Sequence, residues 1–209
     1  MVRRPQERPG GFVIAITGAS GSGKTTLVQA AAALLGDAVP FFFDDYAQVS
    51  HYPQVERWLA EGADPNRWQT PQMAADLRAL RRGEVVTNPR TQDVVTPASY
   101  IVMEEPFGRT RAEMRDLIDF VACIDVPLEV ALARRLLREL ERTADAERAV
   151  STLKRQLPDY IRYVRRVYAV VNAKAMAACE LVLDGTKEPT ELAQQLVLAV
   201  KAAQSVRSL

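Results

Sequence analysis

The chain has 209 residues, of which 48% are hydrophobic, with 27 Lys and Arg against 26 Asp and Glu. This length and composition predict a single globular domain over residues 11–209, after a loose tail at residues 1 to about 10. A formal net charge of +1 with so many apolar residues excludes a mainly disordered chain and a polycation that coats nucleic acid.

The two cysteines, Cys123 and Cys179, lie far apart in apolar stretches without CxxC or Cys/His spacing. This pattern favours neither a disulfide framework nor a zinc site, and it is typical of a reduced, cytoplasmic protein. No apolar run approaches the roughly 20 residues that span a bilayer, so we expect no membrane partner.

Strands and helices alternate along the chain. Five short apolar segments predict buried strands, at residues 12–16, 39–43, 100–103, 117–124 and 180–183. Helical spacing predicts helices at residues 24–35, 72–82, 128–142, 146–157, 160–178 and 188–206, with Pro158 separating two of them. A long insertion at about 47–98 holds a short helix near 54–60 and a small hairpin within 84–98. This alternation predicts a parallel sheet covered by helices on both faces.

A glycine-rich turn between the first strand and the first helix reads GASGSGKT at residues 18–25, which matches the phosphate-binding pattern G-x-x-x-x-G-K-[ST]. Glycines let backbone N–H groups surround phosphate oxygens, and the helix N-terminus adds partial positive charge. In such loops the lysine, here Lys24, reaches the β- and γ-phosphates and the hydroxyl, here of Thr25, binds Mg²⁺. The residues expected to contact nucleotide are Gly18, Ala19, Ser20, Gly21, Ser22, Gly23, Lys24, Thr25 and Thr26.

Three more motifs accompany this loop, and together they resemble the uridine kinase and phosphoribulokinase-like family of small-molecule P-loop kinases. Asp-Asp-Tyr at 44–46 stands for the family's D-x-[FY], Met-Glu at 103–104 for its F-E-G, and Ala-Arg-Arg-Leu-Leu-Arg-Glu at 133–139 for its R-R-x-x-R-D. The resemblance implies an α/β P-loop fold with a five-stranded, mostly parallel sheet and an arginine-bearing lid at about 133–157. It also implies ATP and Mg²⁺ as cofactors.

The resemblance assigns roles to two acidic residues. Asp44 matches the catalytic aspartate that accepts the proton of the substrate hydroxyl, and its place at a strand's carboxyl edge suits a ligand crevice. Asp45 is the alternative base, although side-chain alternation along a strand predicts that the two carboxylates point apart. Glu104 matches the residue that holds the metal's water shell, whereas Glu105 stands where the family often has glycine.

The lid motif supplies Arg134, Arg135 and Arg138 as catalytic candidates. Arg134 and Arg138 are four residues apart and share a helix face that could close over the transferring phosphate. The alternative is a solvated helix whose arginines pair with Glu139 and Glu141.

The substrate-binding residues are less sharply indicated. Candidates are Asp45, Tyr46, Asp64, Arg67 and Trp68. Trp58 could equally stack on a base or simply pack, and His51 is interpreted as structural. The basic, aromatic segment 160–168 is expected to cover the core or a substrate pocket rather than bind nucleic acid.

These features predict a kinase that transfers the γ-phosphate of ATP to a hydroxyl of a small metabolite, first a nucleoside such as uridine or a related sugar-like compound. One alternative is a nucleoside monophosphate kinase, which should carry proline in the phosphate loop, where this chain has Ser20-Gly21-Ser22. Another is a nucleotide-regulated P-loop binding protein without kinase activity. The choice between ATP and GTP and the oligomeric state, including a possible homo-oligomer, stay open.

Overall fold

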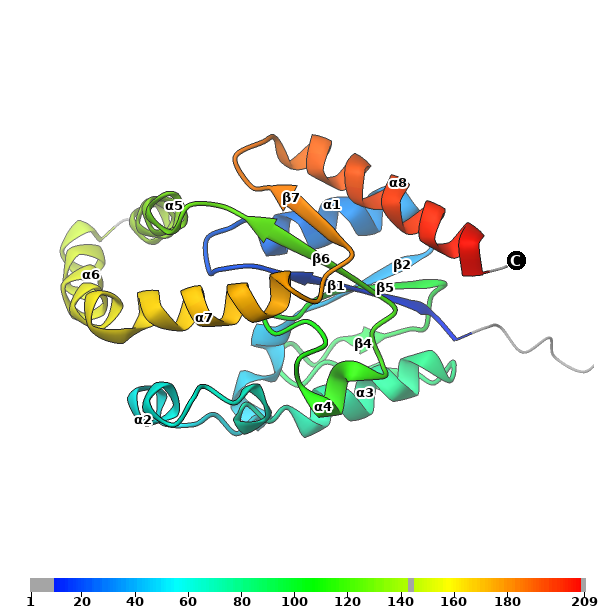
Figure 1. Cartoon of the computed structure of the whole chain (residues 1–209), viewed down its shortest axis with the longest axis horizontal. Coiled ribbons are helices and arrows are strands. Elements are labelled where there is room, and N and C mark those ends of the chain that lie inside the picture. Colours follow the sequence, from blue (N-terminus) through cyan, green and yellow to red (C-terminus); the bar gives the residue numbers. More distant parts are fainter. Residues whose placement is uncertain (1–9, 143–144, 208–209) are drawn as a thin grey trace, which may run out of the picture.

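The computed structural model describes residues 10–142 and 145–207. Its centre is a five-stranded sheet in the order β2-β5-β1-β6-β7, in which all neighbouring strands are parallel (Figure 1). The strands are β1 (Phe12–Thr17), β2 (Ala38–Phe41), β5 (Tyr100–Glu104), β6 (Phe120–Asp125) and β7 (Leu181–Asp184). The predicted five-stranded α/β fold is confirmed. Residues 1–9 of the predicted tail and 143–144 of the predicted lid lie outside the described residues.

Alternate residues of β1 point into two separate cores. Ile14 and Ile16 pack beneath α1 (Lys24–Leu35) and α8 (Pro189–Arg207) on one face of the sheet. Val13 and Ala15 face a second core, to which α3 (Pro71–Arg81) and α7 (Arg165–Met176) contribute (Figure 1). The continuous apolar run of β1 follows from this burial on both faces.

The insertion between β2 and β5 contains η1 (Phe43–Val49), α2 (Val55–Ala60), η2 (Pro65–Arg67), α3 and the antiparallel hairpin β3–β4 (Val86–Thr87 and Val94–Val95). The predicted hairpin is confirmed. The predicted second strand at 39–43 is wrong at its end, because pairing with β5 stops at Phe41 and the Asp45 N–H turns back to the Phe42 carbonyl. Asp44 and Asp45 therefore lie in the first turn of a 3₁₀ helix.

The residues of the expected lid, about 133–157, fall in α5 (Leu128–Glu141) and α6 (Ala146–Asp159), and the chain then continues through a π-helical turn, η3 (Tyr160–Val164), into α7. The predicted separation at Pro158 is wrong, since the helix runs through this residue. Proline cannot donate to the preceding turn, and the wider π turn follows directly, where the helical axis changes direction (Figure 1).

The start of β6 also differs from the sequence prediction. A short helix, α4 (Ala112–Arg115), precedes β6, so that strand begins at Phe120 rather than at 117. Leu117 is part of the turn that ends α4, because its N–H donates to the Met114 carbonyl.

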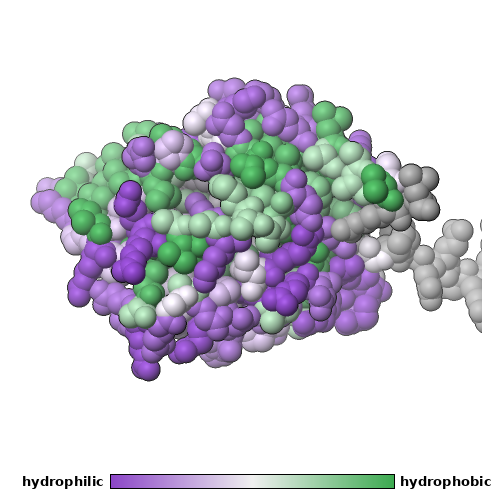
Figure 2. Space-filling view, in the orientation of Figure 1, coloured by the Kyte–Doolittle hydropathy of each residue, from purple (hydrophilic) through white to green (hydrophobic). Residues whose placement is uncertain are grey.

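Hydrophilic residues cover much of the face seen in Figure 2, and hydrophobic ones gather at the end occupied by α5 and α6. The large apolar side chains exposed there are Leu137, Leu140, Val150 and Ile161. None of the described helices is both long and apolar enough to cross a membrane.

Candidate active site

The phosphate loop connects β1 to α1 and forms a small hollow at the carboxyl end of the sheet. Gly21 and Gly23 have φ of +91° and +100°, in the left-handed region that favours glycine. A Cβ atom on Gly21 would lie 2.2 Å from the carbonyl oxygen of Ala131 in α5, so only glycine fits this contact. The first N–H groups of a helix have no helical acceptor, which makes the start of α1 a site for an anion.

Glu104 at the end of β5 connects the two residues that the loop motif assigns to phosphate and metal. Lys24 is only 7% exposed, and its Nζ lies 3.2 Å from Glu104 Oε1 and 3.1 Å from the Ala19 carbonyl oxygen. The Thr25 hydroxyl donates to the other oxygen of Glu104, Oε2, at 3.1 Å. The Glu104 carboxylate thus contacts both the Lys24 ammonium and the Thr25 hydroxyl, one with each oxygen.

The two neighbouring aspartates have different surroundings. Asp44 lines the hollow with Lys24 and Glu104. Desolvation by the surrounding protein, and then the charge of Glu104, raise the pKa of Asp44, while Lys24 opposes this shift. Asp45 is 4% exposed and accepts hydrogen bonds from Arg90 Nε and Asn88 Nδ2, each at 2.6 Å. The two carboxylates thus have different neighbours, but strand alternation, from which the sequence predicts that they point apart, is not the cause, because both residues lie in a 3₁₀ helix.

The three lid arginines of α5 have three different environments. Arg138 lines the hollow of the phosphate loop. Arg134 donates from Nη1 to the Gly185 carbonyl at 2.8 Å. Arg135 lies with its guanidinium about 6 Å from the ring centres of Tyr160 and Tyr168. Arg134 and Arg138 therefore do not converge on one target in this structure, although they share a helix face.

A second cavity, of about 330 Å³, adjoins the hollow and shares Lys24, Asp44 and Glu104 with it. We call it the aromatic cavity, after the five rings in its lining, Phe43, Tyr52, Trp68, Phe107 and Tyr168. Tyr52 stacks on Phe43 with ring centres 5.9 Å apart, and Trp68 lies 5.0 Å from Tyr52 and 5.5 Å from Phe107. On the α7 side the lining includes the carboxamide of Asn172.

Of the substrate candidates, the structure brings Trp68 to this cavity and places the others elsewhere. Tyr46 lies in the core and donates to Asp76 Oδ2 at 2.9 Å. Asp64 caps η2 by accepting from the Asn66 N–H, and Arg67 pairs with Glu61 on the surface. Asp45 is bound by Asn88 and Arg90, which lie between the strands of the β3–β4 hairpin.

The two remaining residues of interest serve packing and backbone pairing. Trp58 packs edge-on against Trp68, with ring centres 5.7 Å apart. His51 forms an isolated backbone bridge with Gln69.

Sequence reasoning missed Phe43, Tyr52, Phe107 and Asn172 as lining residues. Phe43 directly precedes the Asp-Asp-Tyr motif and Phe107 follows Glu104 by three residues, so proximity to the motifs could have indicated both. Asn172 is a polar residue between Val171 and Ala173 on an otherwise apolar stretch, which is a weaker signal.

Comparison with known proteins gives the family of this chain. The sequence model of the Phosphoribulokinase / Uridine kinase family matches residues 64–177. A uridine kinase of Shewanella sp. (strain W3-18-1) is 30% identical over 171 residues, which cover 73% of this chain and 81% of the relative. The chain belongs to the phosphoribulokinase and uridine kinase family. A uridine kinase of Chlamydia pneumoniae is 28% identical over 148 residues, covering 65% of this chain and 67% of the relative.

Solved structures agree on the fold. A gluconokinase from Sinorhizobium meliloti 1021 has a TM-score of 0.53 at 16% identity, with 97% of this chain and 98% of that chain covered. A putative fructose transport system kinase from Silicibacter sp. TM1040 has a TM-score of 0.51 at 17% identity, with 86% and 92% covered. This family member is therefore a P-loop kinase, an enzyme that transfers a phosphoryl group to a hydroxyl acceptor.

Proposed function

We propose that this family member transfers the γ-phosphate of ATP to a hydroxyl group of a neutral nucleoside, with uridine as the first candidate. The observation that carries the proposal is the direct connection between the phosphate-loop hollow and the aromatic cavity. Asp44 belongs to the lining of both spaces, so a hydroxyl group bound in the cavity can meet a phosphate bound in the hollow beside this carboxylate.

The residues of the hollow fit a nucleotide with Mg²⁺. Mg²⁺ at nucleotide sites is bound by one or two carboxylates or hydroxyls together with phosphate oxygens and water, and Thr25 Oγ1 with Glu104 supplies such a pair. Ser22 is 2% exposed, and within the described part of the chain its hydroxyl has no hydrogen-bond partner, which leaves a donor for phosphate inside the loop. Bound Mg²⁺ neutralises phosphate charge, and Lys24 and Arg138 add cations at the same hollow.

Asp44 is the proposed general base. A carboxylate with a raised pKa is a better proton acceptor than an ordinary one, and the presence of Asp44 in the linings of both spaces supports this role. Among the described residues Asp44 has no ion-pair partner, whereas Asp45 pairs with Arg90, so the Asp44 carboxylate remains available to accept a proton. The other alternative for the base, Asp45, is buried and turned away from the cavity.

The charges of the aromatic cavity favour a neutral acceptor. Among the described residues of its lining, Lys24 is the only cation, and it faces the phosphate loop and Glu104. A phosphorylated acceptor would require a second cationic group, most effectively a bidentate arginine. The lack of such a group among the described lining residues and the absence of proline from residues 18–25 both disfavour a nucleoside monophosphate kinase.

The aromatic lining favours an acceptor with a flat ring. Stacking on Tyr, Trp and Phe stabilises a heterocyclic base more than an open sugar chain. The uridine kinases among the relatives support the same choice. The Asn172 carboxamide offers a donor and an acceptor, which suits the edge of a pyrimidine.

The test is a phosphorylation screen with ATP and Mg²⁺, in which mass spectrometry detects the products. The panel contains nucleosides, their 5′-monophosphates, free ribose and sugar acids such as gluconate. We expect a nucleoside monophosphate from at least one nucleoside, formed about 10²- to 10⁴-fold more slowly when Asp44→Asn replaces the wild type. Products only from sugars or only from the monophosphates would contradict the proposal.

A further inference from the structure

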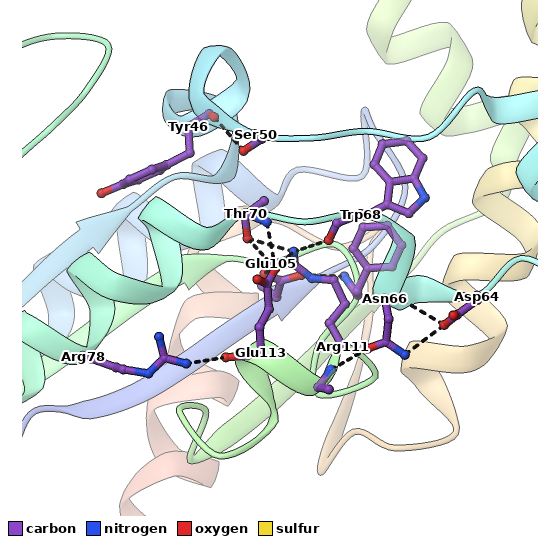
Figure 3. Close-up of polar contacts among 12 residues, drawn as sticks. Tyr46, Ser50, Asp64, Asn66, Trp68, Thr70, Arg78, Glu105, Arg111 and Glu113 are labelled. Atoms are coloured by element: carbon purple, nitrogen blue, oxygen red, sulfur yellow. Dashed lines mark hydrogen bonds and ion pairs between the residues drawn. The ribbon is translucent and has the colours of Figure 1, made fainter.

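The segment at residues 66–70, which carries Trp68 of the aromatic cavity, is bound at alternate residues by the start of α4. Three consecutive residues, 111–113, make these contacts (Figure 3). The bonds run from the Ala112 N–H to Asn66 Oδ1, from Arg111 Nη1 to the Trp68 carbonyl oxygen and from the Thr70 N–H to Glu113 Oε1, each at 2.8 Å. The cavity wall at Trp68 thus depends on this short stretch for its position.

Arg111 is the centre of this arrangement and is fully buried. Its Nη2 lies 2.5 Å from Glu105 Oε2, and its Nη1 lies 2.7 Å from Glu113 Oε1. The guanidinium is also close to two rings of the cavity lining, at 5.7 Å from the centre of Phe43 and 5.5 Å from that of Phe107. Arg111 has two carboxylates beside it and no exposed surface, so it binds protein groups and is not available to bind an anionic acceptor.

Glu105 connects this network to the phosphate site through the backbone. It directly follows Glu104, whose carboxylate contacts Lys24 and Thr25. The two neighbouring carboxylates at the end of β5 therefore hold different parts of the site: Glu104 contacts the phosphate loop, and Glu105 holds Arg111 and, through it, the Trp68 wall.

We propose that Arg111, fixed by Glu105, is a positioning residue that sets the distance between the Trp68 wall and the phosphate loop. Such a residue matters because a misplacement of about 1 Å can lower a transfer rate by about 10²-fold. The inference rests on the proposed function in one respect, namely that the aromatic cavity binds the acceptor. Glu105, at a position where the family often has glycine, then serves to hold Arg111 in place in this chain.

The test replaces both members of the fully buried pair that Arg111 forms with Glu105, and the remaining carboxylate partner, Glu113, is 26% exposed. Removal of one partner would leave the other unpaired, whereas a hydrophobic replacement of both is often tolerated. The variant is therefore Glu105→Leu with Arg111→Met. The matched control is Arg109→Met, because Arg109 also donates to two backbone carbonyls, those of Ile118 and Asp119, and pairs with Glu180, but does not line the cavity.

The first readout is independent of any substrate. The chain has two tryptophans, so Trp58→Phe leaves Trp68 as the sole indole reporter. In this background we expect acrylamide quenching of Trp68 to increase roughly two-fold or more in the Glu105→Leu, Arg111→Met variant, because the wall opens locally. Quenching should not change in the Arg109→Met control.

The second readout is kinetic, with the acceptor found in the screen. We expect the variant to lose about 10- to 100-fold in kcat/KM for the acceptor while KM for ATP stays near the wild-type value. Arg111→Lys serves if the double variant does not fold, since lysine keeps the charge but cannot make the same set of directed bonds; it should show the same changes to a smaller extent.

Three results would overturn the inference: unchanged Trp68 quenching in a folded variant, unchanged acceptor kinetics, or equal effects in the Arg109→Met control. If the wild type phosphorylates no member of the panel, the proposed function fails, but the quenching experiment still decides whether Arg111 holds the wall.

Discussion

Asp45 Oδ1 lies 2.6 Å from Arg90 Nε, so the hairpin β3–β4 holds the residue that directly follows Asp44. Asn88, also between the hairpin strands, contacts the second oxygen of Asp45 at 2.6 Å. This pairing uses Asp45 to anchor the hairpin and leaves Asp44 to face Lys24 and Glu104. The different contacts of two adjacent carboxylates lead to separate predictions for each.

Asp44→Asn should reduce turnover by about 10²- to 10⁴-fold, because the amide keeps the shape of the carboxylate but cannot accept the proton. The affinity for ATP should change little. Asp45→Asn should reduce thermal stability more than turnover, since it weakens the contacts of a buried carboxylate with Arg90 and Asn88. Single-turnover rates and thermal melts of both variants are the measurements. The reverse ranking, with Asp45→Asn the inactive enzyme, would show that Asp45 is the base.

The pH dependence should respond to Arg90. The pKa of Asp44 is raised by desolvation, by Glu104 and by Asp45, and is lowered by Lys24 and Arg90. A base must be deprotonated, so activity falls as the pH drops through this pKa. Arg90→Ala removes a positive charge and leaves the negative charge of Asp45 without its partner, so the pKa of Asp44 should rise further. The acidic limb of the pH–rate profile should therefore move to higher pH.

Arg90→Lys, which keeps the charge, is the control and should show a smaller shift. Adding Asp45→Asn to Arg90→Ala should bring the limb back toward its original position, because both members of the pair are then uncharged. A profile of kcat/KM against pH for the four proteins gives the answer. An acidic limb at the same pH in all of them would contradict the assignment of Asp44.

Much of this site could be predicted from the sequence where backbone spacing determines the contacts. The loop at 18–25 fixes where Lys24 and Thr25 lie, and a parallel sheet brings the end of β5 to the same edge. The position of Glu104 at the end of β5 was therefore sufficient to indicate its neighbours.

The acceptor side could not be predicted in this way. Its rings come from η1, residues 52–68, the loop after β5 and α7, which only tertiary packing brings together. Tyr46 illustrates the difference, because its motif suggests a ligand contact, while a turn of 3₁₀ helix directs its hydroxyl to Asp76 in the core. The ion pair of Asp45 with Arg90 likewise spans 45 residues and leaves no periodic signal.

Among the lid arginines, Arg138→Ala should have the largest effect on transfer. Arg138 lines the phosphate-loop hollow, and loss of one electrostatic donor to a transition state costs about 10²- to 10³-fold in rate. Arg134→Ala and Arg135→Ala should cost less, since their guanidinium groups contact the Gly185 carbonyl and two tyrosines. Single-turnover rates at saturating ATP compare the three variants. Equal rates for Arg138→Ala and wild type would remove Arg138 from the site.

The Thr25 hydroxyl should govern the response to Mg²⁺. Thr25→Val has nearly the same size but lacks the oxygen that contacts Glu104, so the Mg²⁺ concentration for half-maximal activity should rise about ten-fold or more. Thr25→Ser keeps the hydroxyl and is the matched control. Titration calorimetry of ATP with and without Mg²⁺ should show the same difference. Identical Mg²⁺ dependence of Thr25→Val and Thr25→Ser would exclude Thr25 as a ligand.

The proposed reaction is tested most directly by its stoichiometry with a pair of matched acceptors. Uridine and uridine 5′-monophosphate are incubated separately with ATP and Mg²⁺, and ADP and the phosphorylated product are quantified together. We predict one ADP for each uridine 5′-monophosphate formed from uridine. The kcat/KM for the phosphorylated acceptor should be at least about 10²-fold lower, because the described residues of the cavity lining include no second cation to bind its phosphate. ADP with only free phosphate, or faster phosphorylation of the monophosphate, would contradict a kinase that acts on a neutral nucleoside.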